Sequence, residues 1–220
     1  MKKLVIFGLG EIAELAHYYF GQDSNYEVVA FTVDAEYKKQ ENHLGLPVES
    51  FEQVEQKYPP CDYDLFIAVS YQRMNQTREQ KFKEAKNKGY SLVSYISSKA
   101  TTFENLIHGE NCFVLEDNTI QPFAQLGDNV TLWSGNHIGH HAIIKSNSFI
   151  TSHAVISGGV IIGKNSFIGV NATLHDHIKV GAYNLIGAGA LVTRSTIENG
   201  VYLGHPAKLK RTDAKEAGLI

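Results

Sequence analysis

Residues 138–174 read IGHHAI IKSNSF ITSHAV ISGGVI IGKNSF IGVNAT L, and every one of these hexapeptides begins with isoleucine. Taking every sixth residue from Ile120 to Val192 gives thirteen positions, all of them Ile, Leu or Val. Four positions after each, the residue is mostly small, with Asn136, Ile178 and Asn184 as departures. A period of six does not fit a helix and is too regular for a β-sandwich, so it predicts a parallel β-helix with these aliphatic side chains inside.

Three hexapeptides per coil would place residues eighteen apart in register, so that His140 stacks over Gly158 and Asp176. The number of repeats gives four to five coils. A prism of this kind exposes broad faces and open backbone at its ends, so we expect homo-oligomerisation and a capping segment. The terminal residues 213–220, DAKEAGLI, are the candidate cap.

The first hundred residues have a different pattern, in which strand-like and helix-like segments alternate. Apolar runs at 3–8, 26–33, 64–70 and 91–96 predict strands, whereas 11–20 and 75–90 have helical character. This alternation predicts a parallel sheet with right-handed crossovers, about half of a dinucleotide-binding fold. We therefore predict an α/β half-Rossmann domain at residues 1–99, followed by an all-β parallel β-helix domain at residues 100–220.

Composition excludes several classes of function. The net charge is −3 and the sequence pI is near 6.4, with no basic run, which gives no reason to expect nucleic acid or an anionic membrane as partner. The opening MKKLVIFGLGEIAEL is broken by glycines and acids, so it predicts a first strand and not a signal peptide. Cys61 and Cys112 are far apart, without the spacing of a zinc or redox motif. We expect a cytoplasmic protein without membrane insertion.

Two stretches have the residue types of a binding or catalytic site. Gly8, Gly10 and Ala13 form a G-x-G-x-x-A turn after the first strand, and Asp34 ends the second strand, a pattern that suits phosphate and ribose. The glycines could equally serve only close packing of helix on strand. The second stretch, residues 137–141, holds three histidines, and imidazole suits a general base because it titrates near neutral pH.

Several motifs together resemble one family. The hexapeptides IGHHAI, IGKNSF and IGVNAT, the closing GVYLGHPAK, and the N-terminal VIFGLGEIAE and FIAVSYQRMNQTRE are similar to those of NeuD-like sialic acid O-acetyltransferases and PglD-like UDP-amino-sugar N-acetyltransferases. The resemblance covers essentially the whole chain and implies a left-handed β-helix in a homotrimer. It further implies acetyl-CoA bound between neighbouring β-helices, a nucleotide-linked sugar on the N-terminal domain, and no metal.

The resemblance also assigns roles to individual residues. His140 matches the family's general base, with His141 and His137 as neighbours that shape the site. Expected contacts to acetyl-CoA are Gly158, Gly159, Gly187, Ala188, Pro206 and Lys208. Expected contacts to the nucleotide sugar are Gly8, Gly10, Glu11, Asp34, Tyr71, Asn75 and Arg78.

These roles predict an acetyl-CoA-dependent N-acetyltransferase for a UDP- or dTDP-linked 4-amino-6-deoxy sugar of bacterial surface glycan synthesis, acting by direct attack. Family members with amino-sugar activity commonly carry an acidic residue directly after the base, where this chain has His141. O-acetylation of a sialic acid type sugar therefore stays an alternative.

Alternatives of other classes are a zinc-dependent hydratase like the γ-class carbonic anhydrases and a catalytically silent binding protein. The hydratase would leave the N-terminal domain unexplained, and we expect its zinc ligands to lie about a coil apart.

Overall fold

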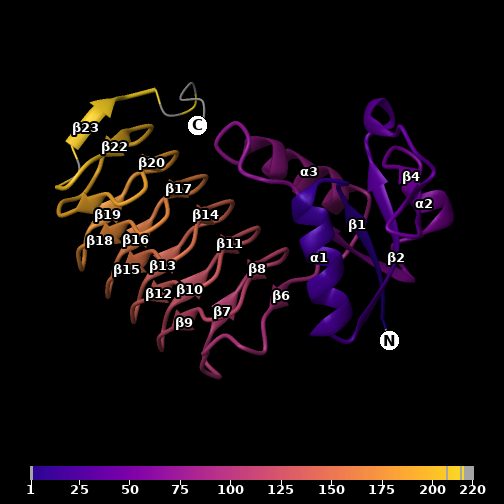
Figure 1. Cartoon of the computed structure of the whole chain (residues 1–220), viewed down its shortest axis with the longest axis horizontal. Coiled ribbons are helices and arrows are strands. Elements are labelled where there is room, and N and C mark those ends of the chain that lie inside the picture. The colour runs from indigo at the N-terminus through magenta and orange to yellow at the C-terminus, as the bar shows by residue number, and fades with distance from the viewer. Residues whose placement is uncertain (1, 207, 214, 216–220) are drawn as a thin grey trace. The chain divides into compact units, whose positions relative to one another are not determined.

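The computed structural model describes residues 2–206, 208–213 and 215, and the chain divides into two compact units (Figure 1). The first unit comprises Met1–Ser70 and Arg78–Tyr95, and the second comprises Tyr71–Thr77 and Ile96–Ile220. The short segment Tyr71–Thr77 therefore groups with the repeats and not with the strand that precedes it. Within the described ranges, no helix combines the length and apolar character needed to cross a membrane.

The first unit is built on a sheet with strand order β3-β4-β2-β1-β5. Its strands are β1 (Lys2–Phe7), β2 (Tyr26–Val33), β3 (Asn42–His43), β4 (Leu46–Ser50) and β5 (Tyr63–Ile67). As predicted, β1 pairs parallel with β2 and β5. The sequence analysis did not predict β3 and β4; β4 pairs parallel with β2, whereas β3 is antiparallel to β4. The carboxyl ends of β1, β2 and β5 meet at one edge, which is where ligands bind in open α/β sheets.

Two helices of twelve residues accompany this sheet. The helices of the unit are α1 (Glu11–Gln22), η1 (Ala35–Tyr37), α2 (Val54–Lys57) and α3 (Gln76–Asn87). The strand predicted at residues 91–96 is shorter than expected, because Leu65 exchanges backbone hydrogen bonds only with Ser91 and Val93 there. The chain then forms β6 (Tyr95–Ile96).

The second unit is the predicted left-handed parallel β-helix, made of strands of two residues. These are β7 (Ile107–His108), β8 (Phe113–Val114), β9 (Thr119–Ile120), β10 (Gln125–Leu126), β11 (Thr131–Leu132), β12 (His137–Ile138), β13 (Ile143–Ile144), β14 (Phe149–Ile150), β15 (Val155–Ile156), β16 (Ile161–Ile162), β17 (Phe167–Ile168), β18 (Thr173–Leu174), β19 (Lys179–Val180), β20 (Leu185–Ile186) and β21 (Leu191–Val192). They form three sheets, ordered β19-β16-β13-β10-β7, β21-β18-β15-β12-β9 and β23-β22-β20-β17-β14-β11-β8-β6. His137 pairs with Thr119 and Val155, which confirms the predicted eighteen-residue register.

The interior of the β-helix is the predicted aliphatic column. All thirteen periodic positions from Ile120 to Val192 are at most 3% exposed. The positions four residues later, from Ala124 to Ala190, are buried as well, including the departures Asn136 and Asn184. Asn136 Oδ1 accepts from Ala154 N at 2.8 Å, and Asn184 Nδ2 donates to Ile197 O at 2.7 Å, whereas Asn184 Oδ1 has no partner among the described residues.

Each turn between sheets has one residue in the left-handed backbone region. Every sixth residue from Asn111 to Gly189 has φ between 54° and 77°. Glycine adopts this region without penalty, and Asn, Asp and His are enriched there among other residues. Along one corner of the prism the turn asparagines form a ladder, in which Asn111 Nδ2 donates to Asn129 Oδ1 (2.8 Å) and Asn129 Nδ2 donates to Asn147 Oδ1 (2.9 Å).

The C-terminal end of the β-helix carries a short antiparallel addition. β22 (Val201–Leu203) pairs with β20 on one side and with the antiparallel β23 (Lys208–Arg211) on the other. The predicted cap at residues 213–220 lies outside the described residues, apart from Asp213 and Lys215.

Substituting an inward residue tests the predicted core. Ile156→Ala removes a fully buried side chain from β15, and we expect it to lower the free energy of unfolding by about 2–5 kcal/mol through lost burial and a residual cavity. Urea denaturation measures this. Val155→Ala on the same strand is the matched control, because Val155 is 38% exposed and points out of the prism. An equal loss for both variants would contradict the inward assignment.

Candidate functional site

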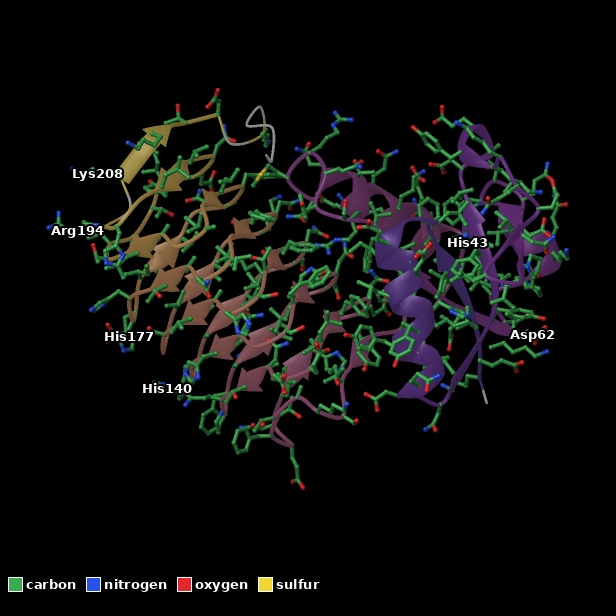
Figure 2. All side chains as sticks on the ribbon, viewed as in Figure 1. His43, Asp62, His140, His177, Arg194 and Lys208 are labelled. Carbon is green, nitrogen blue, oxygen red and sulfur yellow. The ribbon has the colours of Figure 1, made fainter. Side chains whose placement is uncertain are left out.

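His140 lies on one edge of the β-helix, in the turns that lead from the sheet of β9 to the sheet of β7. We call the turns at 121–124, 139–142, 157–160, 175–178 and 193–195 the histidine corner. Because coils repeat every eighteen residues, these segments stack along one edge of the prism. In Figure 2 the labelled His140 and His177 project from the same side of the coils.

The His140 side chain is exposed and leans over the next coil. Its backbone N–H donates to Gln121 Oε1 at 2.8 Å. A Cβ atom at Gly158 would lie 2.7 Å from both Cε1 and Nε2 of the His140 ring. A glycine at 158 therefore leaves room for the imidazole, and the predicted stacking of His140 over Gly158 is confirmed.

His141 takes the left-handed position of the same turn, with φ of 57°. Its Nδ1 lies 3.2 Å from His140 Nδ1, and its ring centroid lies 4.8 Å from that of Phe123 at an interplanar angle of 32°. Asp176, the acid of the corner, is paired with its neighbour His175, with 2.5 Å between Oδ1 and Nδ1. The His140 ring thus contacts His141 and its backbone N–H is bound by Gln121, where the resemblance implies a carboxylate.

The turn at Gly158 offers a hydrogen-bond donor beside the His140 ring. Ser157 N–H donates to Leu174 O and Gly159 N–H donates to His140 O. Within the described part of the chain, the Gly158 N–H has no hydrogen-bond acceptor. One coil earlier, the corresponding N–H of His140 is bonded to the Gln121 side chain, so this position of the turn faces outward.

The expected acetyl-CoA contacts divide between two corners of the prism. Gly158 and Gly159 lie at the histidine corner, whereas Gly187 and Ala188 follow β20 and lead into the sheet of β9. A Cβ at Gly187 would collide with Leu203 Cδ2, so this glycine also permits internal packing. Within one chain these two pairs do not share a corner.

Two residues of the histidine corner were missed in the sequence analysis. His177 stands in the turn position of His141 two coils later, and a Cβ at Gly159 would meet its ring. Arg194 follows Asp176 by eighteen residues, so the register that links His140 to Gly158 would have found it. In Figure 2, Arg194 and Lys208 project on the same side as His140 and His177. Pro206 is exposed between β22 and β23, and Lys208 is exposed at the start of β23.

In the first unit, the two glycines of the turn after β1 have different environments. Gly8 has φ of 124°, and a Cβ there would lie 2.6 Å from Ala68 O, so packing alone demands a glycine. Around Gly10 a Cβ would meet nothing within 4 Å. Gly10 is the N-cap of α1, with the exposed Glu11 next to it, and helix N-termini bind anions through free N–H groups.

Asp34 directly follows β2, and its carboxylate has a partner. Lys81 Nζ lies 2.6 Å from Asp34 Oδ1 and 2.7 Å from Glu84 Oε2, and it also lies 5.5 Å from the centroid of the Phe7 ring. Partial burial disfavours the charged ammonium, but the bonds to Asp34 and Glu84 outweigh it, so the pKa of Lys81 is raised. The sequence analysis missed Lys81, which lies in α3.

The remaining predicted sugar contacts are engaged within the fold. In the second unit, the Tyr71 ring lies 5.1 Å and 4.9 Å from the rings of Phe149 and Phe167, and Asn75 Nδ2 donates to Ser166 O at 3.3 Å. Asn75 is fully buried, and Arg78 in α3 is 2% exposed.

His137 lies on β12, before the histidine corner. Residues 2–206, 208–213 and 215 contain no group of three or more His, Cys, Asp or Glu side chains arranged to hold a metal ion.

Comparison with known proteins places these features in context. Residues 124–158 and 159–194 match the family model of the bacterial transferase hexapeptide (six repeats). Among curated proteins, none matches the chain.

Similar solved structures include PerB from Caulobacter crescentus in complex with CoA and GDP-perosamine, with 24% identity, a TM-score of 0.84, and coverage of 96% of this chain and 98% of that one. The acetyltransferase domain of PglB from Neisseria gonorrhoeae matches with 24% identity, a TM-score of 0.82 and coverage of 95% and 100%. WeeI from Acinetobacter baumannii matches with 18% identity, a TM-score of 0.72 and coverage of 95% and 100%.

The resemblance drawn from the sequence is thus confirmed at the level of the fold: residues 124–194 match the bacterial transferase hexapeptide repeat, and nearly the whole chain shares its fold with PerB and with the acetyltransferase domain of PglB.

Proposed function

We propose that this protein is an acetyl-CoA-dependent N-acetyltransferase that acts on a nucleotide-linked 4-amino-6-deoxy sugar. The observation that carries the proposal is the pairing of an exposed imidazole, His140, with an unbonded backbone N–H at Gly158 on one corner of a hexapeptide β-helix. Acyl transfer to an amine needs a base to accept a proton and a donor for the developing oxyanion, and these two groups supply both.

The comparisons support the choice of substrates. The PerB structure contains CoA and GDP-perosamine, and the PglB acetyltransferase domain has been solved with acetyl coenzyme A. GDP therefore joins UDP and dTDP as a nucleotide to be tested. CoA thioesters and sugar nucleotides are metabolites of the cytoplasm, so we place the reaction there.

In the proposed reaction, His140 accepts a proton from the sugar amine while the amine nitrogen attacks the acetyl carbonyl carbon. The Gly158 N–H donates to the carbonyl oxygen as it gains negative charge. The carbon–sulfur bond then breaks, and CoA leaves with a proton as the free thiol. A positioned general base contributes about 10²- to 10⁴-fold in rate, and holding the two substrates together contributes at least as much.

The proposed path of CoA follows the histidine corner. The thioester lies at His140, and the pantetheine arm crosses Gly158 and Gly159, which have no side chains to block it. Arg194 stands three coils from His140, roughly 14 Å along the prism, and together with Lys208 it would meet the CoA phosphates. Gly187, Ala188 and Pro206 lie elsewhere on the chain and would complete the cleft from a neighbouring subunit, which is why we propose a homotrimer.

The first unit is the proposed holder of the nucleotide. The open space at Gly10 and the N-terminus of α1 suit a phosphate, with Glu11 beside it. Asp34 lies at the same edge of the sheet, where Lys81 holds its carboxylate in place. The contacts of Gly8, Tyr71, Asn75, Arg78 and His137 with the sugar stay predictions from the sequence.

A thiol-release assay tests the proposal. The full-length protein is given acetyl-CoA with each of a panel of UDP-, dTDP- and GDP-linked 4-amino-6-deoxy sugars, and with free sialic acid. We expect thiol release with one or more nucleotide-linked amino sugars, and its loss in His140→Ala. Release with sialic acid alone would replace the proposal by O-acetylation, and full activity of His140→Ala would assign the base elsewhere.

A second prediction concerns the space under the imidazole. Gly158→Ala would place a methyl group 2.7 Å from two atoms of the His140 ring, which must then turn away. We expect a loss of kcat of about 10-fold or more, because a misplaced base loses its orientation, with little change in melting temperature, since the ring is exposed. Unchanged kcat in Gly158→Ala would show that the observed ring position is not the working one.

A further inference from the structure

We propose that His141 is a positioning residue that accepts a hydrogen bond from His140 and thereby fixes the tautomer of the base. The inference rests on the proposed role of His140 and answers how the ring is oriented where the family pattern has an acid. It assigns to a second imidazole the work that a carboxylate does elsewhere.

The distance between the two Nδ1 atoms requires that one of them donates a hydrogen bond and the other accepts it. His140 Nδ1 and His141 Nδ1 are 3.2 Å apart, and the ring planes are inclined at 84°. A neutral imidazole has one N–H donor and one acceptor nitrogen, so one of these two Nδ1 atoms must carry the proton and the other must lack it. With His140 as donor, its Nε2 has the free lone pair, and Nε2 is the atom beside Gly158.

His141 is held more firmly than an exposed side chain usually is. Its backbone has φ of 57° and donates from N–H to Pro122 O at 3.3 Å. One face of its ring packs on Phe123, with 4.8 Å between centroids. These contacts set the direction of the Nδ1 lone pair, so the acceptor stands ready before substrate binds.

An imidazole acceptor makes the pair sensitive to pH in a way that a carboxylate would not. When His140 takes the substrate proton, it becomes an imidazolium that still donates from Nδ1 to neutral His141. A further proton on His141 would occupy the acceptor lone pair and break this contact. As free side chains, imidazole gains a proton near pH 6.5 and a carboxyl group near pH 4, so an aspartate in place of His141 stays an acceptor to lower pH.

The surroundings contribute little other charge to this pair. The preceding coil presents Gln121, Pro122 and Phe123, and the following coil presents Ser157 to Gly159, none of them titratable. His175, Asp176 and His177 stand one coil further, with Asp176 paired to His175.

Two substitutions of His141 change the hydrogen-bond acceptor while keeping the left-handed backbone of the turn. His141→Gly removes the imidazole and keeps the left-handed turn, as Gly159 does one coil later (φ 67°). His141→Asp restores an acceptor that stays charged near neutral pH, and Asp117 shows that this turn position takes an aspartate (φ 59°). His153→Gly is the matched control, since His153 occupies the same turn position (φ 59°) at another corner.

The first readout is independent of activity. With ¹⁵N-labelled histidine in the full-length protein, long-range proton–nitrogen NMR spectra assign the tautomer of His140 at alkaline pH. We expect the Nδ1–H form in the wild type and in His153→Gly, and its loss in His141→Gly. An Nε2–H form of His140 in the wild type would overturn the proposal.

The second readout uses thiol release from acetyl-CoA with the best amino sugar of the panel. We expect kcat to fall about 10- to 100-fold in His141→Gly at little change in KM, and to recover in His141→Asp. On the acid side of the pH profile, log kcat should fall with a slope approaching two in the wild type and one in His141→Asp. Unchanged kcat in His141→Gly, or equal slopes, would overturn the proposal.

The NMR and kinetic measurements distinguish failure of the proposed function from failure of the inference about His141. If the wild type releases no thiol with any sugar of the panel, the proposed function fails, and the NMR spectra still decide whether His141 fixes the tautomer of His140.

Discussion

Burial of one aliphatic side chain per hexapeptide is the constraint on which the β-helix depends. The column from Ile120 to Val192 is buried, and each strand of two residues has too few backbone hydrogen bonds to be stable alone. A slip by one residue would turn an inward side chain outward, so the register is fixed coil by coil. The same register fixes the histidine corner. Because the inward residues Ile138 and Ile156 are paired, His140 lies over Gly158 in the next coil.

This repetition is also why so much of the second unit could be predicted from the sequence. Thirteen positions report the same environment, and together they fix the period, the inward face and the stack of His140 on Gly158. The first unit offers no such redundancy. Its parallel strands follow from alternation, but the contact between Asp34 and Lys81 joins residues 47 apart with no periodic relation, so no local pattern could reveal it.

The predicted acetyl-CoA contacts divide between two corners for a simple geometric reason. Gly158 and Gly187 are 29 residues apart, which is one coil of eighteen plus eleven residues, so Gly187 falls in a turn at another corner of the prism. The resemblance groups them because it implies a ligand between subunits, which would touch different corners of neighbouring chains. The same counting applied to Asp176 leads directly to Arg194. The eighteen-residue register therefore locates each residue on a particular corner of the prism. The family resemblance adds which corners a ligand is expected to contact.

Residue 141 must meet two requirements at once, a left-handed backbone and a side chain that can accept a hydrogen bond from His140. Of the fourteen left-handed turn positions from Asn111 to Gly189, twelve are Asn, His, Gly or Asp. Glutamate is not among the residues favoured in this region, because its longer side chain gains no local hydrogen bond to offset the steric cost. Histidine is favoured there and also has an acceptor nitrogen at Nδ1, close to the backbone. A histidine at 141 thus satisfies the left-handed turn and also places its Nδ1 3.2 Å from Nδ1 of His140.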